Sequence, residues 1–318
     1  MRLLACTFAL AFALLGCEQK RETIECSGQA MGTTWRATIL PQTSSAQDAN
    51  VSKLITNRLE ELEAIFTNWR KESPVSRFND SRSTEWQNVP RELAEVVQFA
   101  REISAQTQGS FDITLGPLID LWGFGAKGRL HQVPAPETFE AARKRCGWEK
   151  VEVKMEPPML RKTQPDVEIN VSALVEGYAA DDVSKRLKEL GYKNFLLDIG
   201  GELLGQGQKR DGSAWKAGIQ QPDEDKGVIT AAIELKNEAL ATSGTYRQFF
   251  EVEGKSYSHV LDGRTGRPVE KRLVSVSVKS PSCFFADAWA TALLSLGPDE
   301  GKALAEKLGI PVFFIAHP

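Results

Sequence analysis

Apolar side chains recur at three- and four-residue steps along several stretches of the chain, a spacing that places them on one face of a helix. The clearest stretch begins at Val51, and a later one is followed by Gly191, a residue type that commonly ends a helix. Pro90 stands where a helix can begin, because the first helical residue needs no N–H donor. Helices are predicted from Val51 to Phe66, from near Pro90 to just before Gly109, from Glu137 to Cys146, from Ser172 to Leu190 and from Phe284 to Leu296.

The remaining apolar runs are short and rich in β-branched and aromatic residues, which is typical of strands. The last run alternates regularly at Val274, Val276 and Val278, and Gly254 and Gly263 mark tight turns between neighbouring runs. Strands are predicted over Phe195–Ile199, Trp215–Ile219, Ile229–Leu235, Tyr246–Val252, Tyr257–Leu261 and Leu273–Val278. This order of elements predicts an α+β fold, a mixed and largely antiparallel sheet packed by helices.

The first residues predict export and anchoring. Arg2 precedes an apolar run from Leu3 to Leu15 that is too short for a permanent transmembrane helix and is typical of a signal peptide. Leu14-Leu15-Gly16-Cys17 is similar to a bacterial lipobox, in which Cys17 carries the lipid. The alternative is an ordinary secretory signal with an incidental cysteine.

The chain therefore divides into three parts by this interpretation. We expect a signal peptide over residues 1–16, a lipidated tether over 17–25 and a single domain over 26–318. The protein would be lipid-anchored in the bacterial cell envelope and face the periplasm or the cell exterior. An odd number of cysteines then remains in the body, and we expect no internal disulfide.

Composition and motifs exclude several functions. Lys and Arg number 39 against 42 Asp and Glu, so the chain lacks the basic excess of a nucleic-acid-binding protein. Three histidines and no CxxC pair argue against structural zinc. Residues 123–128 fit the pattern GxGxxG, but a proline-flanked segment follows where a dinucleotide-binding fold needs a helix.

Two carboxylates stand out as candidates for chemistry. Asp287 and Thr291 are four residues apart in a predicted helix, so their oxygens share one face and suit Mg²⁺. Capping of the helix by Asp287 is an equally good explanation. Asp112 and Thr114 interrupt an apolar run before a Gly-Pro pair, a pattern that favours turn chemistry over ligand contact.

His259 is the best-placed histidine for acid–base chemistry, because it lies within a predicted strand just before a tight turn. His131 lies in a proline-flanked loop, and His317 is next to the last residue. A lone histidine in a strand is more commonly structural.

Eight blocks spread over nearly the whole mature chain resemble, in order, the ApbE family of FAD:protein FMN transferases. They are Met31-Gly32-Thr33, Ser76-Arg77-Phe78-Asn79, residues 109–118 with 121–125, residues 172–179, Asp198-Ile199-Gly200-Gly201, Ala241-Thr242-Ser243-Gly244, residues 258–262 with Thr265-Gly266, and residues 286–291. The resemblance implies a T-fold-like architecture. It also implies Mg²⁺ as cofactor, FAD as substrate, and FMN transfer to a threonine of an acceptor protein with release of AMP. The implied acceptors are subunits of membrane redox complexes, such as sodium-pumping or Rnf-type reductases.

The resemblance also assigns residues to the site. His259 matches a catalytic base, and Ala173, through its carbonyl, matches the metal ligands together with Asp287 and Thr291. The residues that match flavin-nucleotide contacts are Met31, Trp69, Phe111, Asp112, Ile113, Asn170, Glu176 and Leu261. Trp69 can stack on the isoalloxazine, or else fill the core.

The chain departs from the family pattern at two places. Asn170 replaces an aspartate, which removes a charge at a nucleotide contact, and the chain stops about one strand early at Pro318. Two other functions compete with FMN transfer: Mg²⁺-dependent hydrolysis of FAD to FMN and AMP, and non-catalytic flavin binding by a lipoprotein. The Asp287–Thr291 pair weighs against non-catalytic flavin binding.

Overall fold

The computed structural model describes residues 22–41, 48–125, 132–220, 229–246, 248–269 and 273–316. The predicted signal peptide, the predicted lipidation site Cys17 and most of the tether lie outside the described residues. Among the described helices, none has the length and the run of apolar residues that crossing a bilayer requires. The three cysteines of the described part, Cys26, Cys146 and Cys283, are all free, as expected.

One seven-stranded antiparallel sheet organises the larger part of the molecule, in the order β1-β2-β6-β7-β10-β15-β16. Alternate residues of its strands point to opposite faces, so each face carries its own apolar cluster. The strands are β1 (Ile24–Ala30), β2 (Thr33–Ile39), β6 (Phe195–Ile199), β7 (Glu202–Gln206), β10 (Glu238–Gly244), β15 (Leu273–Ser280) and β16 (Val312–Ala316).

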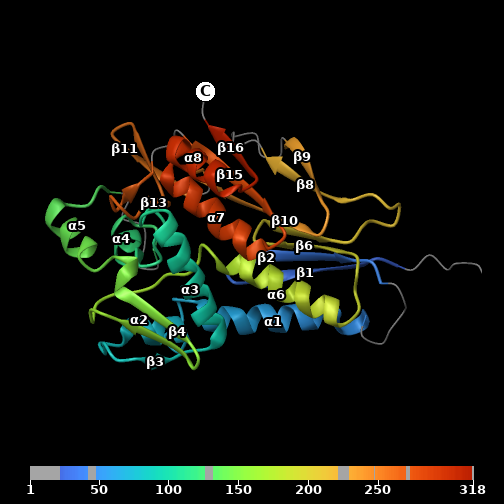
Figure 1. Ribbon diagram of the computed structural model, residues 1–318, viewed down its shortest axis with the longest axis horizontal. Coiled ribbons are helices and arrows are strands. Elements are labelled where there is room, and N and C mark those ends of the chain that lie inside the picture. The colour runs from blue at the N-terminus through green and yellow to red at the C-terminus, as the bar shows by residue number, and fades with distance from the viewer. Residues whose placement is uncertain are drawn as a thin grey trace, which may run out of the picture.

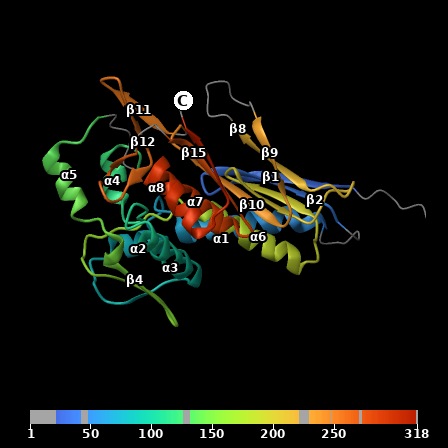
Figure 2. The same cartoon turned by 45° about the horizontal axis from the view of Figure 1, so that its top comes forward.

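Four helices cover one face of this sheet, and a hairpin covers the other (Figures 1 and 2). The helices are α1 (Val51–Phe66), α6 (Val175–Glu189), α7 (Cys283–Leu296) and α8 (Pro298–Leu308). The hairpin is formed by β8 (Trp215–Gln220) and β9 (Ile229–Leu235). Leu196, Leu203 and Leu240 leave the sheet on the hairpin side, where they pack with Trp215.

Smaller elements gather at the end of the sheet opposite the start of β1, on the left in Figure 1. Some of them form a third apolar cluster around Leu118, Trp122 and Phe250, and the others pack into the main core. The elements are α2 (Pro74–Asp80), β3 (Gln87–Asn88), α3 (Arg91–Gln106), α4 (Gly116–Leu121), α5 (Pro136–Arg143), β4 (Val151–Met155), β5 (Pro158–Lys162), β11 (Phe249–Val252), β12 (Lys255–Ser258), β13 (Leu261–Asp262) and β14 (Arg267–Pro268), with a short 3₁₀ turn at Trp148–Lys150. The other 3₁₀ turn, Asp48–Asn50, directly precedes α1.

The predicted α+β class, with an antiparallel sheet packed by helices, is confirmed, and all five predicted helices are present. Gly191 ends α6 with a φ of 89°, as predicted. That helix begins at Val175 rather than Ser172, because the Asn170 side chain accepts the Ser172 N–H at 3.0 Å and holds a turn there. The C-terminal edge is formed by β16, which pairs with β15.

The prediction of one strand over Tyr257–Leu261 is wrong in detail. The strand β12 ends at Ser258, and β13 begins only at Leu261, so His259 lies between two short hairpins rather than within a sheet. One position beyond the last strand pair, Phe249 with Ser258, Gln248 O accepts the His259 N–H at 3.1 Å and also lies 3.1 Å from His259 Nδ1. The predicted strand from Tyr246 likewise begins later, at Phe249.

Candidate active site

A cavity of about 430 Å³ lies where the helices of the main sheet meet the smaller elements. Of the twelve residues that the sequence placed in a catalytic, flavin-binding or metal-binding role, eleven line it. These are Trp69, Phe111, Asp112, Ile113, Asn170, Ala173, Glu176, His259, Leu261, Asp287 and Thr291. The twelfth, Met31, does not line the cavity. It occupies the β1–β2 turn with a φ of 57°, and its N–H donates to Glu63 Oε2 at 2.8 Å.

The charges around the cavity have one sign. Four acidic side chains line it, Asp112, Glu176, Glu202 and Asp287, whereas none of its described lining residues is a lysine or an arginine. Glu202 and Asp287 are only 5% and 6% exposed. A polyphosphate would be repelled by this lining unless a cation entered with it.

The acidic side of the cavity is carried by α6 and α7. Gly177, in the first turn of α6, donates its N–H to Asp287 Oδ2 at 2.9 Å, and Thr291 Oγ1 lies 2.8 Å from Ser243 Oγ on β10. The capping explanation for Asp287 is wrong for its own helix, because the Ser282 hydroxyl caps α7 by accepting the Phe285 N–H. Asp287 and Thr291 instead face the cavity from one side of α7. We call Ala173, Glu176, Asp287 and Thr291 the helical wall.

The helical wall fits Mg²⁺ better than zinc. Besides Glu176, the wall contains the three residues that the resemblance matches to metal ligands. They offer the Asp287 carboxylate, the Thr291 hydroxyl and the Ala173 carbonyl, and hard oxygens of this kind are the ligands that Mg²⁺ prefers. Within the described residues, no group of three or more His, Cys, Asp or Glu side chains is placed to hold a metal. A site with one carboxylate leaves positions for water or for substrate phosphates, which is the usual arrangement for Mg²⁺.

Other lining residues come from loops, and Asp112 organises the first of these loops. Asp112 Oδ1 accepts from the N–H and the hydroxyl of Thr114, both at 2.7 Å, and Oδ2 accepts the Trp148 N–H at 3.0 Å. The predicted turn chemistry is therefore present, and the same residue also lines the cavity. Burial raises the pKa of the Asp112 carboxyl to about 6, against the opposing effect of the hydrogen bonds from Thr114 and Trp148.

His259 lines the same loop-built side. Its Nδ1 lies 3.1 Å from the carbonyl oxygen of Gln248, and its ring lies edge-on to Phe124. Because a carbonyl can only accept, a neutral His259 that donates from Nδ1 carries its lone pair on Nε2. This tautomer is the one that a general base requires at Nε2.

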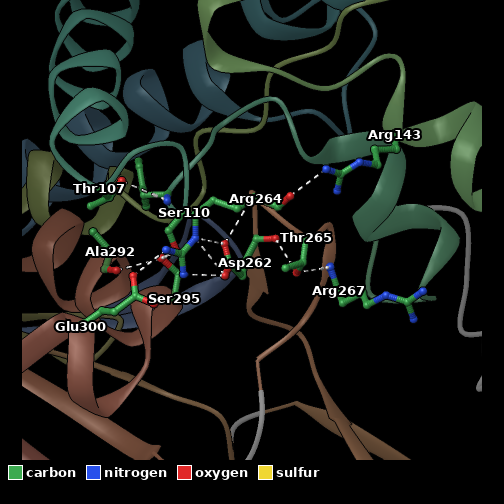
Figure 3. A network of polar contacts seen from close by, with 11 residues as sticks. Thr107, Ser110, Arg143, Asp262, Arg264, Thr265, Arg267, Ala292, Ser295 and Glu300 are labelled. Carbon is green, nitrogen blue, oxygen red and sulfur yellow. Dashed lines mark hydrogen bonds and ion pairs between the residues drawn. The ribbon is translucent and has the colours of Figure 1, made fainter.

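The turn after Leu261 joins the loops to the helices (Figure 3). The Arg264 guanidinium lies between Asp262, at 2.8 Å, and Glu300 of α8, at 2.5 Å. Gly263 donates its N–H to Ser110 O at 2.8 Å. A Cβ at Gly263 would come within 2.2 Å of the Gly109 carbonyl oxygen, so only glycine permits this approach.

Trp69 stands at the edge of the cavity with 72% of its surface exposed. The alternative that it fills the core is therefore wrong. A large exposed indole beside a cavity is suited to covering a flat aromatic ligand. We call Trp69, residues 110–113 and residues 259–261 the loop wall.

Sequence reasoning assigned no role to several lining residues that the fold brings in. Glu202 and Gly200 come from the β6–β7 hairpin, and Thr242, Ser243 and Gly244 come from β10. Gly200 and residues 242–244 belong to blocks that resemble the ApbE family, whereas Glu202 lies one residue beyond the nearest block. The contact between Ser243 and Thr291 joins residues 48 positions apart and has no local signature.

Comparison with known proteins agrees with the family resemblance of the sequence blocks. A family model described as the ApbE family matches residues 31–314. The FAD:protein FMN transferase of Escherichia coli K12 is 35% identical over 317 residues, which span 96% of this chain and 90% of the relative. The Vibrio cholerae O395 protein of the same name is 38% identical over 309 residues, with coverage of 96% and 92%. The solved structure of the flavin transferase ApbE from Vibrio cholerae matches with a TM-score of 0.86 at 36% identity, covering 93% of this chain and 94% of that one. On these matches, the chain belongs to the ApbE family.

Proposed function

We propose that the protein is a Mg²⁺-dependent FAD:protein FMN transferase, which moves FMN from FAD to a threonine hydroxyl of an acceptor protein and releases AMP. The observation that carries the proposal is the lining of the cavity. Four carboxylates without a described lysine or arginine cannot hold a diphosphate alone, and a set of hard oxygens on the helical wall supplies the place for a divalent cation.

In the proposed reaction, one bond to phosphorus forms and one breaks. The threonine oxygen forms a bond to the phosphorus on the FMN side of FAD, and the bond from that phosphorus to the bridging oxygen breaks. AMP leaves with the bridging oxygen, and the hydroxyl proton passes to a base. The residues that would hold Mg²⁺ are Asp287, Thr291 and Ala173, and bound Mg²⁺ would supply charge stabilisation on the phosphate oxygens.

His259 is the base that the cavity offers. The carbonyl of Gln248 beside Nδ1 supports the tautomer with a proton-accepting Nε2, and no other histidine lies among the described residues. A hydroxyl is a weak nucleophile at neutral pH, so proton removal by His259 would accelerate transfer by about 10² to 10⁴-fold.

The loop wall would bind the flavin. Trp69 is exposed beside the cavity and free to stack on the isoalloxazine, while Phe111, Ile113 and Leu261 offer apolar contact. Asn170 contributes a neutral side chain whose Oδ1 already accepts the Ser172 N–H. Its amide NH₂ therefore remains as a donor toward the substrate, where an aspartate would add a fifth negative charge.

The location and the acceptor follow from the same proposal. Lipidation at Cys17 would anchor the protein in the cell envelope, with the domain facing the periplasm or the cell exterior. The acceptor would then be a subunit of a membrane redox complex that exposes its threonine on that side. Hydroxyl attack needs the threonine to enter the cavity near His259, so an exposed loop of the acceptor is required.

One experiment tests the proposed function against hydrolysis and against flavin storage. The purified chain is incubated with FAD and Mg²⁺, with and without an acceptor domain, and AMP and covalently bound flavin are measured. We expect AMP and covalent flavin only when the acceptor is present, and neither in EDTA. AMP without an acceptor would make the protein a hydrolase, and bound FAD without AMP in either tube would make it a carrier.

A further inference from the structure

The two helices of the helical wall cap one another. Asp181 of α6 accepts three hydrogen bonds at the start of α7: from Cys283 N to Oδ1 at 2.9 Å, and from Phe284 N and Ser282 Oγ to Oδ2 at 3.1 and 2.7 Å. In the other direction, Asp287 of α7 accepts the N–H of Gly177 in the first turn of α6. Each carboxylate thus satisfies N–H groups that its partner helix leaves without an intrahelical acceptor.

The paired caps lie at a very close crossing of the helices. A Cβ at Gly177 would be 2.6 Å from both the Asp287 Cβ and the Cys283 carbonyl oxygen, so the two backbones are nearly in contact. Asp287 follows Cys283 by one turn of α7, and Gly177 precedes Asp181 by one turn of α6. The contacts therefore form a closed ring in which the position of α7 along α6 fixes the position of the Asp287 carboxylate.

We infer that Asp181 is a positioning residue for the metal site: by holding the first turn of α7, it sets where Asp287 and Thr291 present their oxygens to the cavity. Asp181 does not line the cavity itself. The inference rests on the proposed function, because it takes Asp287 as a metal ligand. Sequence reasoning gave Asp181 no role.

The chain supplies a matched control in the next residue. Asp182 lies on the same helix and carries the same charge, but it pairs with Arg58, at 2.8 Å, and with Arg186, also at 2.8 Å, away from α7. Replacing either aspartate by asparagine removes one negative charge at a similar place and costs stability. Only Asp181→Asn disturbs the start of α7, because the amide NH₂ cannot accept the bonds that one carboxylate oxygen now receives.

The test measures Mn²⁺ binding to the full chain by electron paramagnetic resonance, with and without FAD, beside the melting temperature of each variant. We expect Asp181→Asn to weaken Mn²⁺ binding about tenfold or more and Asp182→Asn to change it less than twofold, although both lower the melting temperature. If Asp181→Asn does not fold, Ser282→Ala removes one bond of the same ring and should weaken Mn²⁺ binding in the same direction by a smaller factor.

Two results would overturn the inference: Mn²⁺ binding by Asp181→Asn equal to that of the unaltered chain, or equal weakening in both asparagine variants. A third variant separates this failure from failure of the proposed metal site. Asp287→Asn should abolish Mn²⁺ binding; if it binds Mn²⁺ normally, the metal site itself is wrong.

Discussion

The two walls of the cavity are built in different ways. The helical wall is carried by α6 and α7, which cross at Gly177 and hold each other through paired carboxylate caps. The loop wall is carried by irregular segments tied down by side chain to backbone hydrogen bonds, with an exposed tryptophan at its edge. A wall of packed helices fixes oxygens for a small cation, whereas a wall of loops can adapt to a large flat substrate.

The largest loss of transfer activity should come from a substitution in the helical wall. Asp287→Ala removes the only carboxylate of the proposed metal set, and we expect transfer to fall by about 10³-fold or more at saturating FAD and Mg²⁺. Covalent flavin on the acceptor measures this directly. Normal transfer by the variant would place the cation elsewhere in the cavity.

The next effect separates chemistry from binding within the loop wall. His259→Ala should slow transfer by about 10²-fold or more, while FAD binds nearly as well as before, because the side chain removes a proton rather than holding the flavin. Single-turnover rates and FAD titrations check the two quantities. Lost FAD affinity with an unchanged rate per bound complex would make His259 structural.

A moderate loss of FAD affinity should follow when the turn after Leu261 loses the contacts that hold it. Arg264→Leu breaks the contacts to Asp262 and Glu300, so the turn holds Ser110 less firmly, and we expect FAD affinity to fall about tenfold. Arg267→Leu is the control, since that exposed arginine packs on Phe139 and forms none of these contacts. Equal losses in both variants would mean that the turn has no special part in flavin binding.

A smaller effect is expected at the edge of the cavity. Trp69→Ala should weaken FAD binding by about 2- to 10-fold, the size of one aromatic stacking contact, and leave the melting temperature unchanged because the side chain is exposed. Fluorescence quenching of FAD measures the affinity. A drop of several degrees in melting temperature would instead indicate a packing role.

The smallest effect concerns pH. The raised pKa of Asp112, about 6, means that its carboxyl takes up a proton as pH falls from 7.5 to 5, and the cavity then carries one negative charge fewer. Binding of FAD without Mg²⁺ should therefore strengthen at low pH, by about twofold for one screened charge. The step should persist in His259→Ala and vanish in Asp112→Asn; a step that vanishes only in His259→Ala would assign the titration to the histidine.

The helical wall could be predicted from the sequence further than the loop wall. Regular spacing revealed both helices and placed Asp287 and Thr291 on one face. The spacing could not decide whether Asp287 caps a helix or binds a ligand, because Asp287 accepts a hydrogen bond from Gly177, 110 positions away. Distance along the chain, rather than weak local signal, hid the paired caps.

In the loop wall, the residues themselves marked only Asp112 and His259, and the other members were found through blocks that resemble a family. Strand periodicity placed His259 inside one strand, whereas β12 ends at Ser258 and β13 begins only at Leu261. The hydroxyl contact between Ser110 and Ser295 spans 185 positions and has no periodic pattern. Met31 was assigned to the flavin but does not line the cavity, and its backbone N–H donates to Glu63, so its flavin contact stays a prediction.

The most direct test is a crystal structure of the chain with FAD and Mn²⁺, with anomalous scattering used to place the metal. We predict an anomalous peak in contact with the Asp287 carboxylate and the Thr291 hydroxyl, beside the FAD diphosphate, with the isoalloxazine against Trp69. A peak away from α7, or FAD bound in the cavity with full occupancy and no metal beside Asp287, would contradict the account, in which the helical wall binds the metal and the loop wall binds the flavin.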